Sequence, residues 1–226
     1  DPEMSRGLGD VYKRQVEGDA WIETWKEHFR PFNIGKVVVC PAWLDHAPKA
    51  GETTVKIDTF MAFGTGEHET TSMCVELLQE FMRPGETVID VGCGSGILSI
   101  AALRLGAASA TAVDIDDKCL TVAYENAALN GIGKDTYTVL VGDVFSDEAF
   151  RARVGGGYDI LAANIVADVI KALAPMARSF LKPGGLFLCS GIIDDRAEEV
   201  AQALTDAGLE ILETRSSEGW FSYLCR

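Results

Sequence analysis

Apolar segments typical of buried strands alternate with helical segments along most of the chain after residue 70. We predict strands at 87–91, 109–114, 136–141, 158–163 and 186–190, and helices at 97–105, 117–130, 146–153, 166–181 and 195–207. Strands separated by helices pair in parallel through crossover connections, which cover both faces of the sheet. The alternation therefore predicts an α/β protein with a doubly wound, mostly parallel sheet.

The two ends of this alternating region differ from its middle. The last two strands, 209–214 and 220–225, are separated only by "RSSEG", so they can form a hairpin that makes one strand antiparallel. At the other end, Thr70 is expected to cap a helix that runs to about Met82.

The N-terminal part has a different organisation. We predict an amphipathic helix at 21–32 and short strands at 36–40 and 52–58. The expected segments are a non-native or disordered leader at 1–15, a linker helix with short strands at 16–60, and the main domain at 61–226.

A glycine-rich turn, "VIDVGCGSG", lies between the first parallel strand and its helix. Its glycines, Gly92, Gly94 and Gly96, allow a ligand to approach the backbone closely, and the following helix N-terminus favours polar or anionic groups. The spacing differs from the dinucleotide fingerprint G-x-G-x-x-G, whose third glycine position is Ile97 here. The turn predicts a nucleoside-containing cofactor without identifying it.

Three polar side chains end the next strands at the same sheet edge. Asp114 follows Gly92 by 22 positions and is suited to accept both hydroxyls of a ribose. Asp143, which ends "LVGD", is suited to bind an adenine amino group, although acidic residues also end strands for structural reasons. Asn164, in "AANI", offers a carbonyl acceptor for an amine nucleophile, or it caps the helix from Val166.

The composition narrows the chemistry and the partners. The 226 residues carry six scattered cysteines and three distant histidines, so we expect buried thiols in the cytoplasm and no metal site. No apolar run is long enough to span a membrane. The net charge of −14 disfavours direct binding of nucleic acid and favours a basic protein or amine substrate, although it also fits an ordinary acidic surface.

Several of these motifs, in this order, resemble the class I S-adenosylmethionine-dependent methyltransferases. Six motifs in a fixed order narrow this resemblance to one family within the class. They are "MAFGTGEHETTSMC" at 61–74, the glycine turn, "VDID", "ENAALNG", "ANIVADVI" and "LKPGG". Together these motifs are similar to the bacterial ribosomal protein L11 methyltransferases (PrmA) over roughly residues 20–226. "FGTGEHETT" is the specific part, because the glycine turn is shared with other methyltransferases.

The resemblance implies a fold, a reaction and a set of site residues. The fold would be the seven-stranded, Rossmann-like methyltransferase sheet with an antiparallel last strand. The enzyme would transfer methyl groups from S-adenosylmethionine to lysine side chains and the N-terminal amine of the ribosomal protein. Matching by motif, Thr71, Gly92, Asp114 and Asn164 would bind the cofactor, and Asn164 would also act in catalysis.

Other positions complete the predicted site from the residues themselves. Gly64 forms a turn before the helix that contains Thr71, and the start of that helix suits the methionine carboxylate of the cofactor. His68 could lie over the reacting centre, or it could only pack or cap, and Gly94 belongs to the glycine turn. Family members also carry a small N-terminal substrate-binding domain, for which residues 1–20 are too few.

Three functions remain open from the sequence alone. The first is a protein amine methyltransferase that acts on the ribosomal protein. The second is a methyltransferase of the same fold that acts on another protein or on a small amine. The third is a nucleotide-binding reductase or a non-catalytic binding module, which the G-x-G-x-G spacing and "ANI" disfavour.

Overall fold

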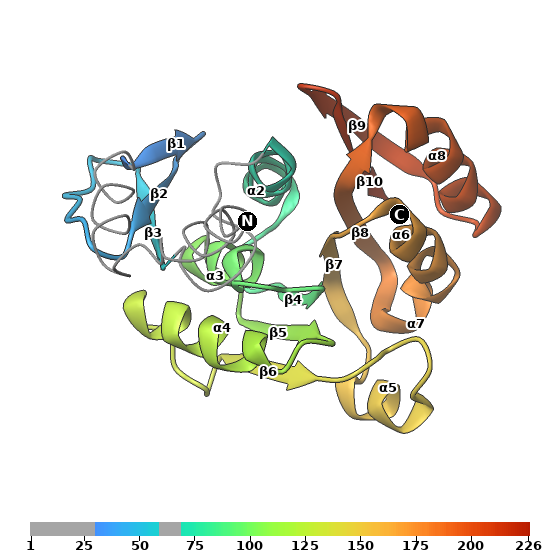
Figure 1. Cartoon of the computed structure of the whole chain (residues 1–226), viewed down its shortest axis with the longest axis horizontal. Helices are drawn as coiled ribbons and strands as arrows, with labels where there is room; N and C mark the ends of the chain where they lie inside the picture. Colours follow the sequence, from blue (N-terminus) through green and yellow to red (C-terminus); the bar gives the residue numbers. More distant parts are fainter. Residues whose placement is uncertain (1–29, 59–68) are drawn as a thin grey trace, which may run out of the picture. The chain divides into compact units, whose positions relative to one another are not determined.

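The computed structural model describes residues 30–58 and 69–226, and a seven-stranded sheet lies at the centre of the second range. The strand order is β6-β5-β4-β7-β8-β10-β9, as seen in Figure 1. These strands are β4 (Thr87–Val91), β5 (Ser109–Asp114), β6 (Tyr137–Val141), β7 (Tyr158–Asn164), β8 (Leu181–Ile193), β9 (Ile211–Ser217) and β10 (Trp220–Cys225). All neighbouring pairs from β6 to β8 are parallel, whereas β10 runs antiparallel to both β8 and β9.

The chain order creates a switch point at the middle of this sheet. From β4 the chain moves outward to β5 and β6, and then returns to place β7 on the other side of β4. The loops after β4 and β7 therefore leave the carboxyl edge in opposite directions and open a crevice between them. Open α/β sheets bind ligands at such a position, so the fold points to this edge for the functional site.

Helices cover both faces of the sheet, as Figure 1 shows. One face packs against α2 (Glu69–Phe81), α3 (Ile97–Arg104) and α4 (Lys118–Leu129). The other face packs against α5 (Glu148–Val154), α6 (Ala167–Leu173), α7 (Ala177–Phe180) and α8 (Ala197–Asp206). The strands between them alternate: Val88 belongs to the first core and Ile89 to the second.

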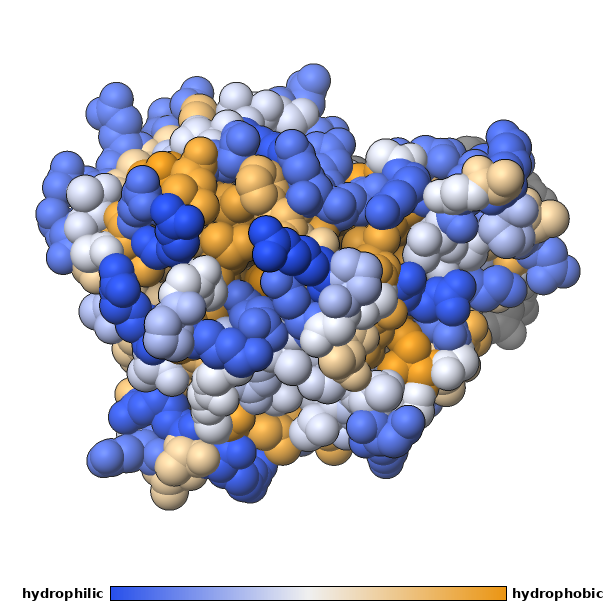
Figure 2. All heavy atoms as spheres, turned by 180° about the vertical axis from the view of Figure 1, so that it is seen from behind, coloured by the Kyte–Doolittle hydropathy of each residue, from blue (hydrophilic) through white to orange (hydrophobic). Residues whose placement is uncertain are grey.

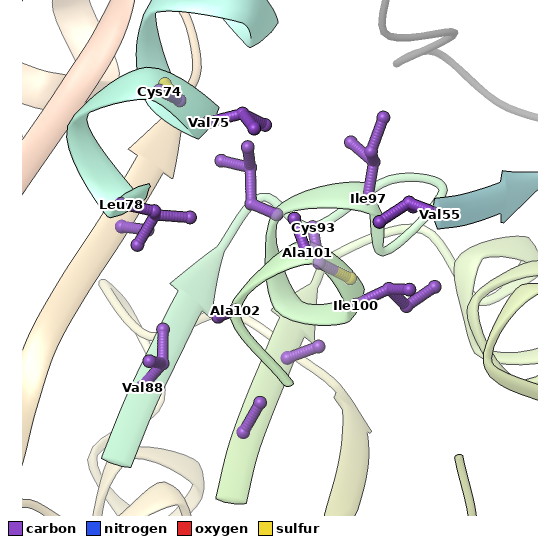
Figure 3. Close-up of a cluster of buried hydrophobic side chains, with 14 of the residues drawn as sticks. Val55, Cys74, Val75, Leu78, Val88, Cys93, Ile97, Ile100, Ala101 and Ala102 are labelled. Carbon is purple, nitrogen blue, oxygen red and sulfur yellow. The ribbon is translucent and has the colours of Figure 1, made fainter. Parts of the chain in front are cut away.

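A second, three-stranded sheet packs against the same side as α3. It consists of β1 (Phe32–Ile34), β2 (Val37–Pro41) and β3 (Thr53–Ile57), with β1 antiparallel and β3 parallel to β2. Figure 3 shows Val55 of β3 beside Ile97 and Ile100 of α3. Residues 31–226 form one compact unit, and this unit includes β1, β2 and β3.

The doubly wound sheet and its antiparallel last strand are as predicted, and most element boundaries agree within two residues. The predicted helix at 166–181 is wrong, because it is divided into α6, a 3-10 turn (Ala174–Met176) and α7. Pro175 lies in that turn, where it cannot donate the backbone hydrogen bond that a continuous helix requires.

Other boundaries were also misplaced. The strand predicted at 186–190 extends over Leu181–Ile193, because Leu181 already pairs with Tyr158 before the "KPGG" irregularity. The strand predicted at 209–214 occupies Ile211–Ser217 instead. The helix predicted at 21–32 does not reach its expected end, since Phe32 begins β1; its first part lies outside the described residues.

The start of α2 also differs from the prediction. This helix already includes Glu69, so Thr70 lies within its first turn and is not its cap. Met73, Leu77 and Leu78 are buried as the periodicity predicts.

The surface mixes polar and apolar side chains, as Figure 2 shows for the face opposite to that of Figure 1. Within residues 30–58 and 69–226, no helix combines the length and apolar character needed to cross a membrane.

Candidate functional site

A cavity of about 710 Å³ opens at the carboxyl edge of the large sheet, next to the switch point. Five of the residues singled out from the sequence line it: Gly92, Gly94, Asp114, Asp143 and Asn164. They come from four separate segments, at the ends of β4, β5, β6 and β7. Parallel pairing of these strands is what brings the ends together, as expected for this fold.

The glycine turn between β4 and α3 is held by backbone and side-chain bonds. Gly92 and Cys93 both donate their N–H groups to the Val113 carbonyl, at 2.8 and 3.1 Å. Gly92 has a φ of 77°, and a Cβ added there would lie 2.3 Å from Ile165 Cγ2. Glycine suits this position because it adopts a positive φ without strain and leaves room for the Ile165 side chain.

Asp114 connects the end of β5 to the glycine turn. Its Oδ2 accepts a hydrogen bond from Gly94 N at 2.9 Å, and its Oδ1 accepts one from Asp116 N at 3.0 Å. Each carboxylate oxygen can accept more than one hydrogen bond, so both remain available to hydroxyl groups of a ligand. The two backbone contacts fix the direction in which this carboxylate points.

Asp143 is held in a similar way after β6. Phe145 N donates to its Oδ1 at 2.7 Å, and Ser146 Oγ donates to its Oδ2 at 2.5 Å. These hydrogen bonds, with the one from Ser146 contributing most, lower the pKa of Asp143 below its ordinary value. The side chain is therefore ionised at neutral pH and acts as an acceptor.

Asn164 ends β7 and contacts α2. Its Nδ2 donates to Thr71 Oγ1 at 3.1 Å, which joins two residues 93 positions apart in the sequence. The alternative role as a helix cap is wrong, because Val166 occupies the cap position of α6 without a side-chain bond from Asn164. With Nδ2 engaged by Thr71, the carboxamide oxygen is the acceptor that faces other partners.

Three of the predicted site residues are not among the described residues that line the cavity. Gly64 and His68 lie outside the described residues. Thr71 is buried in α2 and reaches the site through Asn164 rather than by lining the cavity.

Two features of this site were not predicted from the sequence: its apolar rim and the buried side chain of Asp90. Ile115 and Val166 line the cavity and are 76% and 65% exposed. The available clue was their position, because Ile115 directly follows Asp114 and Val166 follows Asn164 by two residues. Such side chains can cover a flat ring of a ligand and exclude water from it.

Asp90 lies beneath the glycine turn on β4 and is buried. Its Oδ2 accepts hydrogen bonds from Ser99 N at 3.2 Å and Ser99 Oγ at 2.8 Å, whereas its Oδ1 has no partner among the described residues. Burial, opposed by the Ser99 bonds, raises the pKa of Asp90 to about 6. The aspartate of "VIDVG" was visible in the sequence, but its burial was not.

The cysteines of this region are structural. Cys119 lines the cavity, and burial together with nearby carboxylates raises its pKa to about 12. Cys93, in the glycine turn, has its pKa raised in the same direction by burial. Both thiols are therefore protonated at neutral pH and are poor nucleophiles. Among the described residues, no group of three or more His, Cys, Asp or Glu side chains is arranged to hold a metal ion.

Comparison with known proteins gives a consistent result. A family model for ribosomal protein L11 methyltransferase (PrmA) matches residues 3–226. The ribosomal protein L11 methyltransferase of Symbiobacterium thermophilum is 45% identical over 97% of this chain, and that of Caldanaerobacter subterraneus subsp. tengcongensis is 41% identical over 94%. This chain spans 71% and 66% of the lengths of these two relatives.

A solved structure extends the similarity to the fold. The crystal structure of the ribosomal protein L11 methylase from Lactobacillus delbrueckii subsp. bulgaricus matches with a TM-score of 0.79 and 32% identity. The match covers 88% of this chain and 98% of that chain.

Proposed function

This chain belongs to the ribosomal protein L11 methyltransferase (PrmA) family, and on that basis we propose that it methylates amino groups of ribosomal protein L11. The proposed donor is S-adenosylmethionine, and the proposed targets are lysine side chains and the N-terminal amine. The observation that carries the proposal is that the glycine turn, Asp114 and Asn164 line one and the same cavity. A cytoplasmic location follows as part of the same proposal, since ribosomal proteins are its substrates.

The residues around the cavity fit S-adenosylmethionine. A volume of about 710 Å³ lies within the usual range of ligand cavities, roughly 300–1,000 Å³. We assign the ribose hydroxyls to Asp114 and the adenine amino group to Asp143, whose lowered pKa keeps it an acceptor. Ile115 and Val166 supply apolar surface at the rim for the adenine ring.

We assign the positioning of the substrate amine to Asn164. When bound, S-adenosylmethionine supplies a methyl group on a positively charged sulfur that already carries its leaving group. The carboxamide oxygen of Asn164 can accept a hydrogen from the amine and thereby aim the nitrogen lone pair. Thr71 supports this orientation by accepting the hydrogen bond from Asn164 Nδ2. Positioning of this kind can contribute several kcal/mol to the rate.

The target amine must be neutral when it reacts. A lysine amine has an unperturbed pKa of about 10.4, so it reaches the enzyme as a cation. The net charge of −14 attracts such a cation, while the apolar rim favours loss of its charge when the amine is desolvated. We therefore assign no dedicated general base among the described residues of the cavity.

The proposal is tested by incubating purified, unmodified ribosomal protein L11 with this chain and S-adenosylmethionine, and measuring the intact mass of the ribosomal protein. Mass gains in steps of one methyl group are expected. A parallel reaction with Asp114→Ala controls for a contaminating methyltransferase. If the wild-type chain binds the cofactor but adds no mass, the proposed substrate is wrong, and another protein or a small amine takes its place.

A further inference from the structure

The side of strand β3 that faces away from β2 is covered by two side chains from the C-terminal end of α4. Among the described residues, β3 pairs only with β2, so alternate backbone groups along its other side point away from the three-stranded sheet. Asn130 Oδ1 accepts from Lys56 N at 2.8 Å, and its Nδ2 donates to Lys56 O at 2.7 Å. Two residues further on, Asn126 Oδ1 accepts from Asp58 N at 2.7 Å. Carboxamides at the end of α4 thus take the place of a neighbouring strand.

Asn126 differs from Asn130 because its second bond leads to the glycine turn. Its Nδ2 donates to the carbonyl oxygen of Ser95 at 2.9 Å, 31 positions away. One partner of Asn126 is an N–H donor and the other is a carbonyl acceptor, so only one orientation of the carboxamide satisfies both. Asn126 is 1% exposed, which makes loss of either bond costly.

The Ser95 carbonyl lies in the glycine turn directly after Gly94, which lines the cofactor cavity. Gly94, the preceding residue, donates its N–H to the Asp114 carboxylate, and Gly96, the next residue, is the N-cap of α3 with a φ of 79°. The peptide groups of these three residues are linked covalently, so an anchor on the Ser95 carbonyl restricts the directions of its neighbours. Asn126 itself does not line the cavity.

We infer that Asn126 is a positioning residue for S-adenosylmethionine: its buried carboxamide holds the Ser95 carbonyl of the glycine turn and ties that turn to the end of β3. This inference rests on the proposed cofactor site and adds a residue outside the cavity. It also makes the three-stranded sheet part of the support of the cofactor site. Asn130 attaches the same strand without contacting the turn, which provides a matched comparison.

The test compares the dissociation constant of S-adenosylmethionine for the wild-type chain, Asn126→Ala and Asn130→Ala by isothermal titration calorimetry. Asn126→Ala is expected to weaken binding by about tenfold or more, because a buried hydrogen bond to the turn is lost. Asn130→Ala is expected to change binding less than about twofold, because it removes contacts only with Lys56 and the Asn126 backbone.

A second readout uses the chain without cofactor. Amide hydrogen exchange of the glycine turn, including Gly94, is expected to accelerate in Asn126→Ala and to stay unchanged in Asn130→Ala. If Asn126→Ala does not fold, Asn126→Asp replaces it. That variant keeps an oxygen that accepts from Asp58 N, and it replaces the donor to Ser95 by a second carboxylate oxygen, which repels the Ser95 carbonyl and adds a buried charge. It is expected to weaken cofactor binding to a similar extent.

The possible results of these experiments distinguish a failure of the inference about Asn126 from a failure of the proposed function. Wild-type affinity in a folded Asn126 variant would overturn the role of Asn126 and leave the cofactor site standing. Equal losses in Asn126→Ala and Asn130→Ala would also overturn it, because they would indicate only a general loss of stability. A wild-type chain that binds no S-adenosylmethionine would overturn both the inference and the proposed cofactor site.

Discussion

At the scale of single residues, the orientation of the Asp114 carboxylate is fixed, because backbone N–H groups donate to both of its oxygens. Asp114→Asn keeps the shape but turns one acceptor into a donor and removes the charge. We expect cofactor binding to weaken by at least tenfold, since a hydrogen bond to a charged group is worth about 1.5–3 kcal/mol. Calorimetric titration with S-adenosylmethionine measures the effect. Asp117→Asn, an exposed neighbour that does not line the cavity, is the control and should retain wild-type affinity.

The hydrogen bond between Asn164 and Thr71 gives a second prediction for single residues. Asn164→Ala should reduce the rate of methyl transfer by roughly 100-fold through lost positioning, and should affect cofactor affinity much less. Thr71→Val removes the acceptor that orients Asn164, so a smaller loss of rate is expected, whereas Thr71→Ser retains the hydroxyl and the rate. Steady-state kinetics and cofactor titration on the same preparations separate rate from binding. Equal losses of transfer rate and of cofactor affinity in Asn164→Ala would indicate that Asn164 only binds the cofactor and does not position the amine.

At the scale of elements, the junction between β4 and α3 depends on Gly96. Its φ is 79°, and an added Cβ would lie 2.6 Å from Tyr137 Oη and 3.2 Å from Ala123 Cβ. We expect Gly96→Ala to lower the free energy of unfolding by about 2–4 kcal/mol through backbone strain and overpacking. Gly131→Ala is the control: its φ is 69°, but nothing lies within 4 Å of the added Cβ, so only about 1 kcal/mol is lost. Urea unfolding of both variants measures the difference.

Tyr137 offers a rescue of the Gly96 variant. Its hydroxyl is buried and has no hydrogen-bond partner among the described residues, so Tyr137→Phe should cost little stability by itself. The double variant Gly96→Ala/Tyr137→Phe should recover part of the stability lost in Gly96→Ala, because the nearest clashing atom is removed. A double-mutant cycle of unfolding free energies gives the coupling. Strict additivity would show that the hydroxyl is not the source of the strain.

At the scale of the whole molecule, buried and exposed carboxylates oppose each other in the pH dependence of stability. Burial raises the pKa of Asp90 to about 6 in the folded state, above the unfolded value near 3.9. The folded state therefore binds more protons through this group, and its contribution to stability falls as pH rises between these values. Asp143 acts in the opposite sense, since hydrogen bonds lower its pKa and its contribution is lost as pH falls.

The Asp90→Asn variant tests this balance. Relative to the variant, the wild-type chain should lose about 2 kcal/mol of unfolding free energy between pH 4 and pH 6.5, at about 1.4 kcal/mol for each pKa unit. Denaturant unfolding at a series of pH values measures the difference. Asp143→Asn should give a difference of the opposite sign. A flat difference curve for Asp90→Asn would mean that Asp90 titrates near its ordinary value.

The arrangement of the large sheet was predictable from the sequence, whereas some boundaries of its helices and strands were not. The strand–helix alternation after residue 70 was sufficient for the doubly wound sheet, because parallel strands need crossover helices. Hydrophobic periodicity did not reveal the break of the helix predicted at 166–181, for which Pro175 was a local signal. It did not reveal the early pairing of Leu181 either, because that pairing depends on the neighbouring strand β7. The site residues at the strand ends were accessible for a related reason: the carboxyl ends of parallel strands share one edge.

The sequence by itself determined the fold class, the glycine turn and the strand-ending residues Asp114, Asp143 and Asn164, because each follows from a local pattern or from topology. Only the tertiary structure decided how Asn126 is used. Its two partners, Asp58 and Ser95, lie 68 and 31 positions away, and no local pattern encodes contacts at that separation. Burial of Asp90 and the bond between Asn164 and Thr71 were decided in the same way, because they arise only when helices and strands pack together.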